Sequence, residues 1–537
     1  MQAIEDVAKE LGLSPEDLLP MGRGKAKVDL GALNRAPRAR GKLILVSAVT
    51  PTKSGEGKTT MSISLAMGLR KLERRAVVCL REPSLGPVFG MKGGGTGGGK
   101  AQIVPAADIN LHFNGDLHAI TAAHNLLAAM VDNDLHFGGK SGLDARRITW
   151  PRVMDMNDRA LRQVLIGLGG QNGGVPRESR FDITAASEVM AVLALSEGPE
   201  DLRARLGRLV VGYAAKRRAV TADDLGAAEA MAALLRDALM PNLVQTQEGG
   251  PALVHGGPFA NIAHGCSSVL ATRMGMRYAD YVVTEAGFGF DLGGEKFLDI
   301  KCRQAGLWPR CVVLVATIKA LQSHGRGNLE EGLAHLDRQK ESIGGFGLRP
   351  VVAINAFPDD SPEDLAKVEA HCAKLGLRVA ACTGFAEGGE GSRALAEQVL
   401  EEIEASDASP PEPRHPYPLE ASYPDKLRAV ARAVYGAEDV AFTGPALKTL
   451  QRFDQDHPGL PVCVAKTHLS FSDDPAGGGL AKGFVPTVRS ARAYLGAGFV
   501  TALMGDIMTM PGLPREPAAR RVKIEPNGRI RGLMQND

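Results

Sequence analysis

A glycine-rich loop that ends in Lys58 and Thr59 carries the groups that bind the phosphates of a nucleotide. Residues 50–60 are T-P-T-K-S-G-E-G-K-T-T, and they directly follow an apolar run. Gly55 and Gly57 allow a tight turn, so that backbone N–H groups can face a phosphate. The Lys58 ammonium can reach the outer phosphates, and the Thr59 hydroxyl can bind Mg²⁺. The loop therefore predicts phosphoryl-transfer chemistry that starts from MgATP or MgGTP.

The loop is a shortened form of the Walker A pattern, because the full pattern has a glycine where Thr52 stands. The apolar residues that follow predict a helix, and the N-terminus of a helix favours an anion. We expect the whole loop to contact the nucleotide. The predicted ATP-binding residues are Thr52, Lys53, Ser54, Gly55, Glu56, Gly57, Lys58 and Thr59.

Three charged side chains are candidates for a second part of the site. Arg81 and Glu82 directly follow the apolar run 76–80, at the strand end that faces the ligand in doubly wound folds. An arginine there can hold a phosphate or a carboxylate through two parallel hydrogen bonds. Glu82 and Asp116 offer oxygen ligands, which suit K⁺ or Mg²⁺. A surface ion pair is the alternative for Arg81, but its place beside the P-loop strand favours a role in binding.

Two phenylalanines in glycine-rich segments can hold a flat ring. Phe288 lies in the sequence G-F-G-F-D at 287–291, and Phe385 precedes E-G-G-E-G at 387–391. Aromatic residues in glycine loops mostly fill a hydrophobic core. Two of them can instead stack on the faces of one heterocycle.

Strands and helices alternate along the chain, which indicates a mostly parallel sheet covered by helices. At 537 residues the chain is too long for a single core. We predict an α/β fold with a P-loop NTPase-like, mostly parallel sheet in a large N-terminal domain and two smaller α/β domains. The predicted boundaries are 1–348, 349–455 with a proline-rich linker near 409–423, and 456–537.

Two further segments have a composition that indicates their structure. The glycine run 90–100 lies between a strand and a helical segment, so we favour a site built from backbone over a flexible linker. Residues 157–240 are rich in Ala, Leu and Arg, which predicts helices.

The overall composition is that of a soluble protein. The charges nearly balance, with 63 basic and 61 acidic residues and a net charge of +2, which argues against a general nucleic-acid binder. No apolar stretch reaches transmembrane length, so no membrane partner is expected. The seven cysteines form no C-x-x-C pair, and the acidic N-terminus differs from a signal peptide. These features predict a cytoplasmic protein.

Taken together, the motifs resemble those of the formate–tetrahydrofolate ligase family over almost the whole chain. The matching segments are the loop at 50–60, R-E-P-S-L-G-P at 81–87, G-D-x-H-A-I-T-A-A-H-N-L-L at 115–127, H-G-G-P-F-A-N-I-A-H-G-C at 255–266, T-E-A-G-F-G at 284–289, A-K-T-H-x-S-x-S-D-D-P at 465–475, G-A-G-F at 496–499 and M-P-G-L-P at 510–514.

The resemblance implies an ATP-dependent ligase that joins formate to tetrahydrofolate and releases ADP and phosphate, with formyl phosphate as the intermediate. Lys58 and Arg81 are then the catalytic residues, and the pterin ring lies between Phe288 and Phe385. The resemblance also implies a monovalent cation, K⁺ or NH₄⁺, as activator near Glu82 and Asp116. A homotetramer is implied as well.

The chain departs from the family pattern at a few positions. They are Gly95, Thr96 and Lys100 in the glycine run, Lys319, Gln322 and Arg326 in a second motif, Lys53 in the loop, and Phe385 where some members have tryptophan. The P-loop lysine and Arg81 are unchanged, so the departures bear on folate contacts more than on the reaction.

Two alternatives from other classes stay open. One is a ParA/MinD-like switch ATPase, because Lys53 lies five residues before Lys58, as the extra loop lysine of that group does. The chain is about twice the length that such a switch needs. The other is a relative that binds folate or a partner without catalysis.

Overall fold

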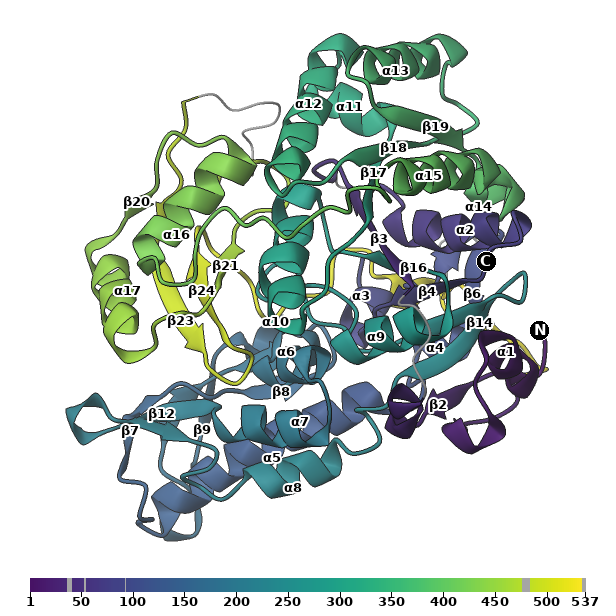
Figure 1. The fold of residues 1–537 in the computed structure, drawn as a ribbon. Coiled ribbons are helices and arrows are strands. Elements are labelled where there is room, and N and C mark those ends of the chain that lie inside the picture. The colour runs from purple at the N-terminus through teal and green to yellow at the C-terminus, as the bar shows by residue number, and fades with distance from the viewer. Residues whose placement is uncertain (36–40, 53–54, 92, 476–482, 534–537) are drawn as a thin grey trace.

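The computed structural model describes residues 1–35, 41–52, 55–91, 93–475 and 483–533 (Figure 1). Lys53 and Ser54 therefore lie outside the described residues. A 12-stranded sheet forms the centre of the described chain. Its parallel part consists, in spatial order, of β15 (Pro251–Val254), β4 (Ala76–Leu80), β16 (Tyr281–Glu285), β3 (Lys42–Ala48), β17 (Cys311–Ala316), β18 (Pro350–Asn355) and β19 (Arg378–Cys382).

The parallel strands are apolar along their length because helices cover both faces of the sheet. Ile44 of β3 belongs to a hydrophobic cluster with residues of α2 (Lys58–Lys71). The next residue, Leu45, belongs to the cluster on the opposite face, with residues of α9 (Val269–Tyr278). Helix α15 (Arg393–Ala405) lies beside α2 (Figure 1). The mixed α/β architecture with a large, mostly parallel sheet is thus confirmed.

Antiparallel strands extend one side of this sheet. Strand β14 (Asn242–Thr246) pairs with β15, with β2 (Ala26–Val28) and with β6 (Ala101–Val104), and β1 (Leu18–Pro20) pairs with β2. The N-terminal segment therefore joins the central sheet.

The second and third predicted domains relate to the sheet in different ways. Strands β18 and β19 continue it next to β17, so the predicted boundary after residue 348 falls inside one sheet. A separate three-stranded sheet consists of β21 (Val462–Ala465), β24 (Phe499–Leu503) and β23 (Ser490–Tyr494). The helices α16 (Tyr423–Val430) and α17 (Gly444–Asp456) precede it in the chain. The exact boundaries stay predictions.

The segment 157–240 is only partly helical, so this expectation was partly wrong. It contains helices α6 (Glu188–Leu195), α7 (Pro199–Gly207) and α8 (Ala228–Leu234), but also strands β9 (Val164–Ile166), β10 (Arg177–Ser179), β11 (Phe181–Ile183), β12 (Val210–Ala214) and β13 (Ala219–Thr221). Three of these strands contain valine, which favours a strand over a helix.

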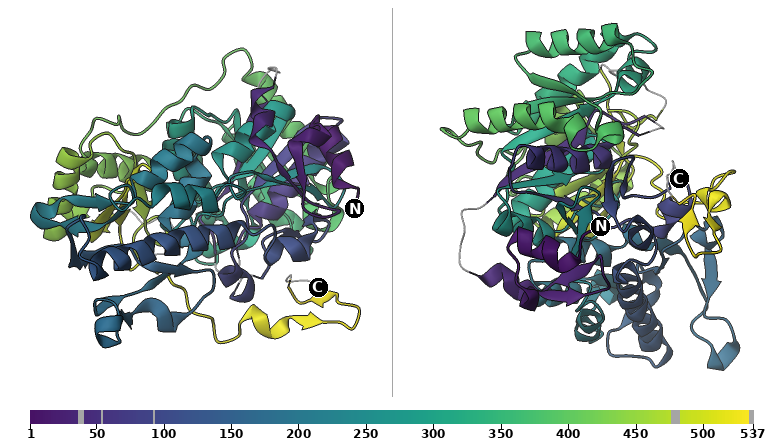
Figure 2. Two further views of the ribbon diagram at one scale, coloured as in Figure 1. Left: turned by 90° about the horizontal axis from the view of Figure 1, so that it is seen from below. Right: turned by 90° about the vertical axis from the view of Figure 1, so that its right-hand side faces the viewer.

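The C-terminal segment returns from the three-stranded sheet to the N-terminal part of the molecule, as Figure 2 shows in yellow. There it contacts the glycine run. The Ala518 N–H donates to the Gly90 oxygen (2.8 Å), and the Gly94 N–H donates to the Leu533 oxygen (2.9 Å). Among helices of the described residues, none is long and apolar enough to cross a membrane.

Candidate active site

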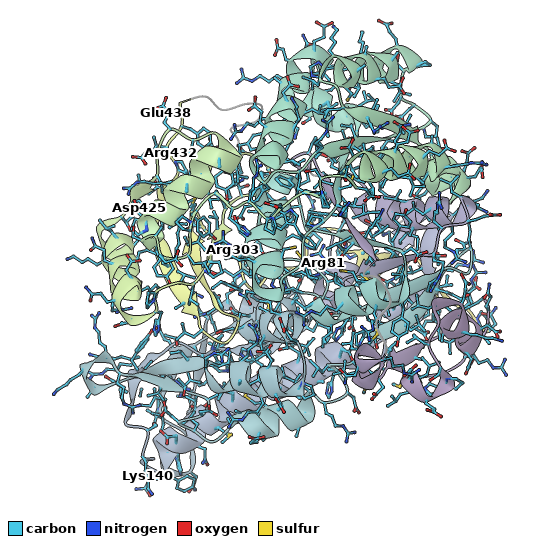
Figure 3. The ribbon with its side chains drawn as sticks, in the orientation of Figure 1. Arg81, Lys140, Arg303, Asp425, Arg432 and Glu438 are labelled. Atoms are coloured by element: carbon cyan, nitrogen blue, oxygen red, sulfur yellow. The ribbon has the colours of Figure 1, made fainter. Side chains whose placement is uncertain are left out.

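Three adjacent parallel strands end at one place in the molecule. In the order β4, β16, β3, each strand is hydrogen-bonded to the next. Arg81 directly follows β4, Glu285 is the last residue of β16, and Thr50 lies just beyond β3. Figure 3 shows Arg81 near the centre of the molecule. The sheet thus brings Arg81 and the glycine-rich loop to the same edge.

The loop turns into helix α2 through two glycines with left-handed backbone. Gly55 and Gly57 both have φ of 75°, a conformation that other residues rarely adopt. Gly57 is the N-cap of α2, and Lys58 is the first residue of that helix. Lys58 and Thr59 therefore occupy the first turn, where free N–H groups and the helix dipole favour an anion.

Glu56 shapes the loop through contacts within the protein. Its side chain is buried, and its Oε1 accepts hydrogen bonds from the Thr52 N–H (2.8 Å) and the Thr52 hydroxyl (3.0 Å). Its Oε2 accepts from the Thr317 hydroxyl (2.6 Å). The Asn355 amide donates to the Glu56 backbone oxygen (3.2 Å). Both carboxylate oxygens have protein partners, so these contacts assign Glu56 to loop structure.

Glu285 is a site residue that the sequence reasoning missed. Its Oε2 accepts a hydrogen bond from the Thr59 hydroxyl (2.8 Å), and its Oε1 lies 3.5 Å from Nη2 of Arg81. The motif T-E-A-G-F-G contains this glutamate, but only the pairing of β16 with both β3 and β4 reveals its neighbours.

Arg81 has room because Gly287 has no side chain. A Cβ on Gly287 would lie 3.1 Å from Nη1 of Arg81 and 2.5 Å from Cβ of Ala260. The Arg81 Nε is buried without a hydrogen-bond partner among the described residues. The guanidinium therefore has a free donor in addition to its contact with Glu285.

Glu82 and Asp116 lie together, as the sequence suggested, but a lysine is already beside them. Nζ of Lys27 lies 2.7 Å from Oδ1 of Asp116, and the Asn242 amide donates to Oδ2 (2.7 Å). Lys27, Asp116 and Glu82 are all buried. Burial, and then the neighbouring charge of Asp116, hold the pKa of Glu82 well above its ordinary value. The Glu82 carboxyl and the Asp116 carboxylate are hydrogen-bonded neighbours.

The two predicted aromatic residues lie on different elements. Phe288 follows β16 with a φ of 60° and stacks on His468, with 4.4 Å between ring centroids and 22° between ring planes. Phe385 lies on α14 (Gly384–Glu387), is 43% exposed and faces the glycine run. A Cβ on Gly99 would lie 2.0 Å from the Phe385 oxygen, so the absence of side chains allows this approach. His468 was not predicted.

The glycine run is folded, which excludes a flexible linker for its described residues. It includes β5 (Gly97–Gly98), which pairs with β6. The Asn110 side chain accepts from the Gly95 N–H (2.7 Å) and donates to the Thr96 hydroxyl (3.0 Å). The Lys100 N–H donates to the Phe385 oxygen (2.8 Å). Each of the three positions that depart from the family pattern, 95, 96 and 100, thus takes part in a hydrogen bond of this folded segment.

The departures in the second motif lie around helix α11 (Ile318–His324) and make surface contacts. Lys319 pairs with Asp359 (2.7 Å), and the Gln322 amide donates to Asp364 (3.4 Å). Arg326 follows the helix with a φ of 55°.

His255 and Cys266 have structural roles. The two ring nitrogens of His255 bond to the Ser268 hydroxyl and the Ala238 oxygen, both at 2.7 Å, and burial lowers its pKa to about 4. Burial raises the pKa of Cys266 to about 12, so the thiol stays protonated and unreactive.

The oxygen atoms near Thr59 fit a magnesium ion that arrives with a nucleotide. Mg²⁺ prefers oxygen ligands and binds through few protein groups together with phosphates. The Thr59 hydroxyl is such a group, and it donates its proton to the Glu285 carboxylate (2.8 Å), which leaves its lone pairs for the ion. No cluster of three or more His, Cys, Asp or Glu residues suited to a metal occurs among the described residues, so the protein alone offers no closed cage.

Fold and site together define an α/β protein with charged residues gathered at the carboxyl edge of a parallel sheet. Comparison with known proteins makes the assignment specific. The family model described as formate–tetrahydrofolate ligase matches residues 1–534. The chain is 59% identical to the formate–tetrahydrofolate ligase of Myxococcus xanthus (strain DK1622) over 549 residues, which cover 100% of both chains.

Two further relatives carry the same name. Those of Hyphomonas neptunium (strain ATCC 15444) and Paracoccus denitrificans (strain Pd 1222) are 53% and 52% identical, and each alignment covers 99% of this chain and 97% of the relative. The chain belongs to the formate–tetrahydrofolate ligase family, and its enzyme class is that of the ligases.

Proposed function

We propose that this protein joins formate to tetrahydrofolate at the expense of ATP, giving 10-formyltetrahydrofolate, ADP and phosphate. The observation that carries the proposal is the meeting of Lys58, Thr59 and Arg81 at the ends of three adjacent strands. This arrangement occurs in a chain that matches the family over residues 1–534.

In the first step, a formate oxygen attacks the γ-phosphorus, and the bond from that phosphorus to the β,γ-bridging oxygen breaks. The products are formyl phosphate and ADP. Phosphoryl transfer needs positioning and charge neutralisation more than covalent help from the protein. Lys58 and the first turn of α2 hold the phosphates, and Thr59, hydrogen-bonded to Glu285, would hold Mg²⁺, which neutralises phosphate charge when bound.

Arg81 is proposed to hold formyl phosphate. Its guanidinium is a fixed fork, which suits the two oxygens of an acyl phosphate. In the second step, N10 of tetrahydrofolate attacks the formyl carbon and loses its proton, and the carbon–oxygen bond to phosphate breaks. Arg81 would neutralise the departing phosphate.

The pterin ring is proposed to stack on Phe288 and Phe385. His468 already covers one face of Phe288, so the pterin takes the other face or displaces the imidazole. The exposed ring of Phe385 beside the glycine run offers a second stacking face.

A monovalent cation near Glu82 and Asp116, a homotetramer and a cytoplasmic location also belong to the proposal. Lys27 and Asn242 hold the two oxygens of Asp116, so a cation would bind mainly through the carboxyl oxygens of Glu82.

An ADP-release assay with and without each acceptor tests the function. A ligase should release ADP only slowly when formate is absent. When formate is present, adding tetrahydrofolate should give steady ADP release together with formation of 10-formyltetrahydrofolate. Formate-independent ATP hydrolysis would instead indicate a switch ATPase. Folate binding without ADP release would indicate a relative that has lost catalysis.

A further inference from the structure

We propose that Glu285 is a positioning residue that orients two side chains at once: Thr59 at the magnesium end of the site and Arg81 at its anion end. The inference rests on the proposed function and adds to it a residue that acts through both Thr59 and Arg81.

The position of Glu285 is fixed by the sheet. It is the last residue of β16, the strand between β4, which leads to Arg81, and β3, which leads to the glycine-rich loop. Its side chain is 5% exposed, so solvent screens its charge little. Helix, loop and strand ends therefore meet at one buried carboxylate.

The two oxygens of Glu285 have different partners. Oε2 accepts the Thr59 hydroxyl proton at 2.8 Å, which fixes the hydroxyl rotor and leaves its lone pairs free for a cation. Oε1 lies 3.5 Å from Nη2 of Arg81. At this distance the hydrogen bond is weak, so it orients the guanidinium and leaves its other N–H donors available for an anion. The unpartnered Nε of Arg81 is consistent with a donor held ready for an anion.

Glu56, the other buried glutamate of the loop region, cannot do this. Its two oxygens bond to Thr52 and Thr317, which support the loop backbone. Glu285 contacts the two proposed ligand-binding side chains themselves. Groups that orient a metal ligand commonly change metal affinity 10- to 100-fold when they are removed, roughly the range expected here.

The test is ADP binding by calorimetry at a series of Mg²⁺ concentrations. Glu285→Gln keeps the shape, but it removes the charge and turns an amide toward Thr59 or Arg81. The Mg²⁺ concentration for half-maximal ADP affinity should rise about 10-fold. Thr59→Val should give a similar shift. The double variant should differ from Thr59→Val by less than about 2-fold, because Glu285 acts on the metal through Thr59.

Glu188→Gln is the matched control. Glu188 is also a buried glutamate, but it bonds to Gly496 and Ala497 in the C-terminal part, so its loss should leave the Mg²⁺ dependence unchanged. If Glu285→Gln does not fold, Glu285→Asp replaces it. The shorter carboxylate should give a shift in the same direction, and an unchanged Mg²⁺ dependence would overturn the proposal.

A second measurement covers the anion end. Formate-dependent ADP formation at saturating Mg²⁺ should fall at least about 10-fold in Glu285→Gln and stay reduced at any Mg²⁺ concentration, because Arg81 has lost its orienting charge. Normal turnover at saturating Mg²⁺ would overturn the link to Arg81.

The experiment distinguishes failure of the proposed ligase function from failure of the role proposed for Glu285. Wild-type protein should bind ADP in a Mg²⁺-dependent way, and Lys58→Ala should weaken that binding. If wild type shows no such binding, the proposed function fails. If wild type and Lys58→Ala behave as expected but Glu285→Gln keeps the wild-type Mg²⁺ dependence, only the role of Glu285 is overturned.

Discussion

At the scale of single residues, Arg81 is defined by what surrounds it. Glu285 orients one end of the guanidinium, the bare backbone of Gly287 makes room for it, and Nε has no partner among the described residues. Such a group binds an anion through its geometry as well as its charge.

Arg81→Lys should therefore separate nucleotide binding from chemistry. The ammonium keeps the charge but loses the fork, so MgATP affinity should stay within a few-fold while formate-dependent turnover falls about 100-fold. Calorimetry and an ADP-release assay measure the two effects. The control Arg180→Lys changes an arginine that pairs with Asp182 and should leave both unchanged. Loss of MgATP binding in Arg81→Lys would assign Arg81 to the nucleotide.

Phe385 offers a test of the folate wall, by which we mean the proposed stacking surface formed by Phe385 and the glycine run 90–100. Phe385→Ala should raise the KM for tetrahydrofolate several-fold and leave the KM for ATP unchanged, because one stacked face contributes on the order of 1 kcal/mol. Phe385→Trp should preserve or lower the folate KM, since the indole offers a larger face. Equal effects on both substrates, together with a lower melting temperature, would mean that Phe385 serves packing.

Glu82 and Asp116 are the proposed site at which a monovalent cation would activate the enzyme. At fixed ionic strength, replacing a bulky organic cation by K⁺ or NH₄⁺ should raise activity if the ion binds at Glu82 and Asp116. Lys27→Met should increase that dependence, because Asp116 would lose its present ammonium partner. A flat response in both proteins would show that neither carboxylate recruits an ion.

At the scale of elements, helix α6 is tied to the C-terminal sheet by one buried carboxyl. Glu188 Oε1 accepts from the Gly496 N–H (2.8 Å) and the Ala497 N–H (3.3 Å), at the turn between β23 and β24. Burial raises the pKa of Glu188 from 4.5 to about 8. The folded protein therefore keeps a proton that the unfolded chain has already lost.

The consequence for stability has a definite sign. As the pH rises from about 4.5 to 8, only the unfolded state releases this proton, so the free energy of unfolding falls by up to about 1.4 kcal/mol per pH unit. Glu188→Gln keeps an acceptor oxygen but cannot ionise. Urea unfolding should show the variant more stable than wild type at pH 8 and nearly equal at pH 4.5. Equal stability at both pH values would show that Glu188 ionises normally in the folded protein.

The elements differ in how far the sequence predicts them. The parallel strands are predictable because burial on both faces makes them continuous apolar runs. The antiparallel strands β1, β2 and β14 are short, and β2 and β14 contain polar residues such as Lys27 and Asn242, so no local pattern marks them. Lys58 and Thr59 belong to a local motif, whereas Glu285 and Lys27 gain their places from pairings between distant strands.

At the scale of the whole molecule, the two ends of the proposed site are supported by different parts of the chain. Glu56, Thr317 and Asn355 hold the glycine-rich loop within the central sheet. The glycine run is instead held from outside by the C-terminal segment, through Ala518 and Leu533 (Figure 2). Nucleotide and folate binding should therefore respond differently to changes in the tail.

A chain that ends at Pro517 tests this division. It loses the hydrogen bonds of Ala518 to Gly90 and of Gly94 to Leu533, each worth about 1 kcal/mol. The glycine run also bonds to Phe385 through Lys100, so loosening it should raise the folate KM several-fold. Mg²⁺-dependent ADP affinity should stay unchanged, because the contacts of the loop remain. Limited proteolysis should cut the shortened chain faster near residues 90–100. Equal loss of nucleotide and folate affinity would show that the tail stabilises the whole N-terminal part rather than the folate wall.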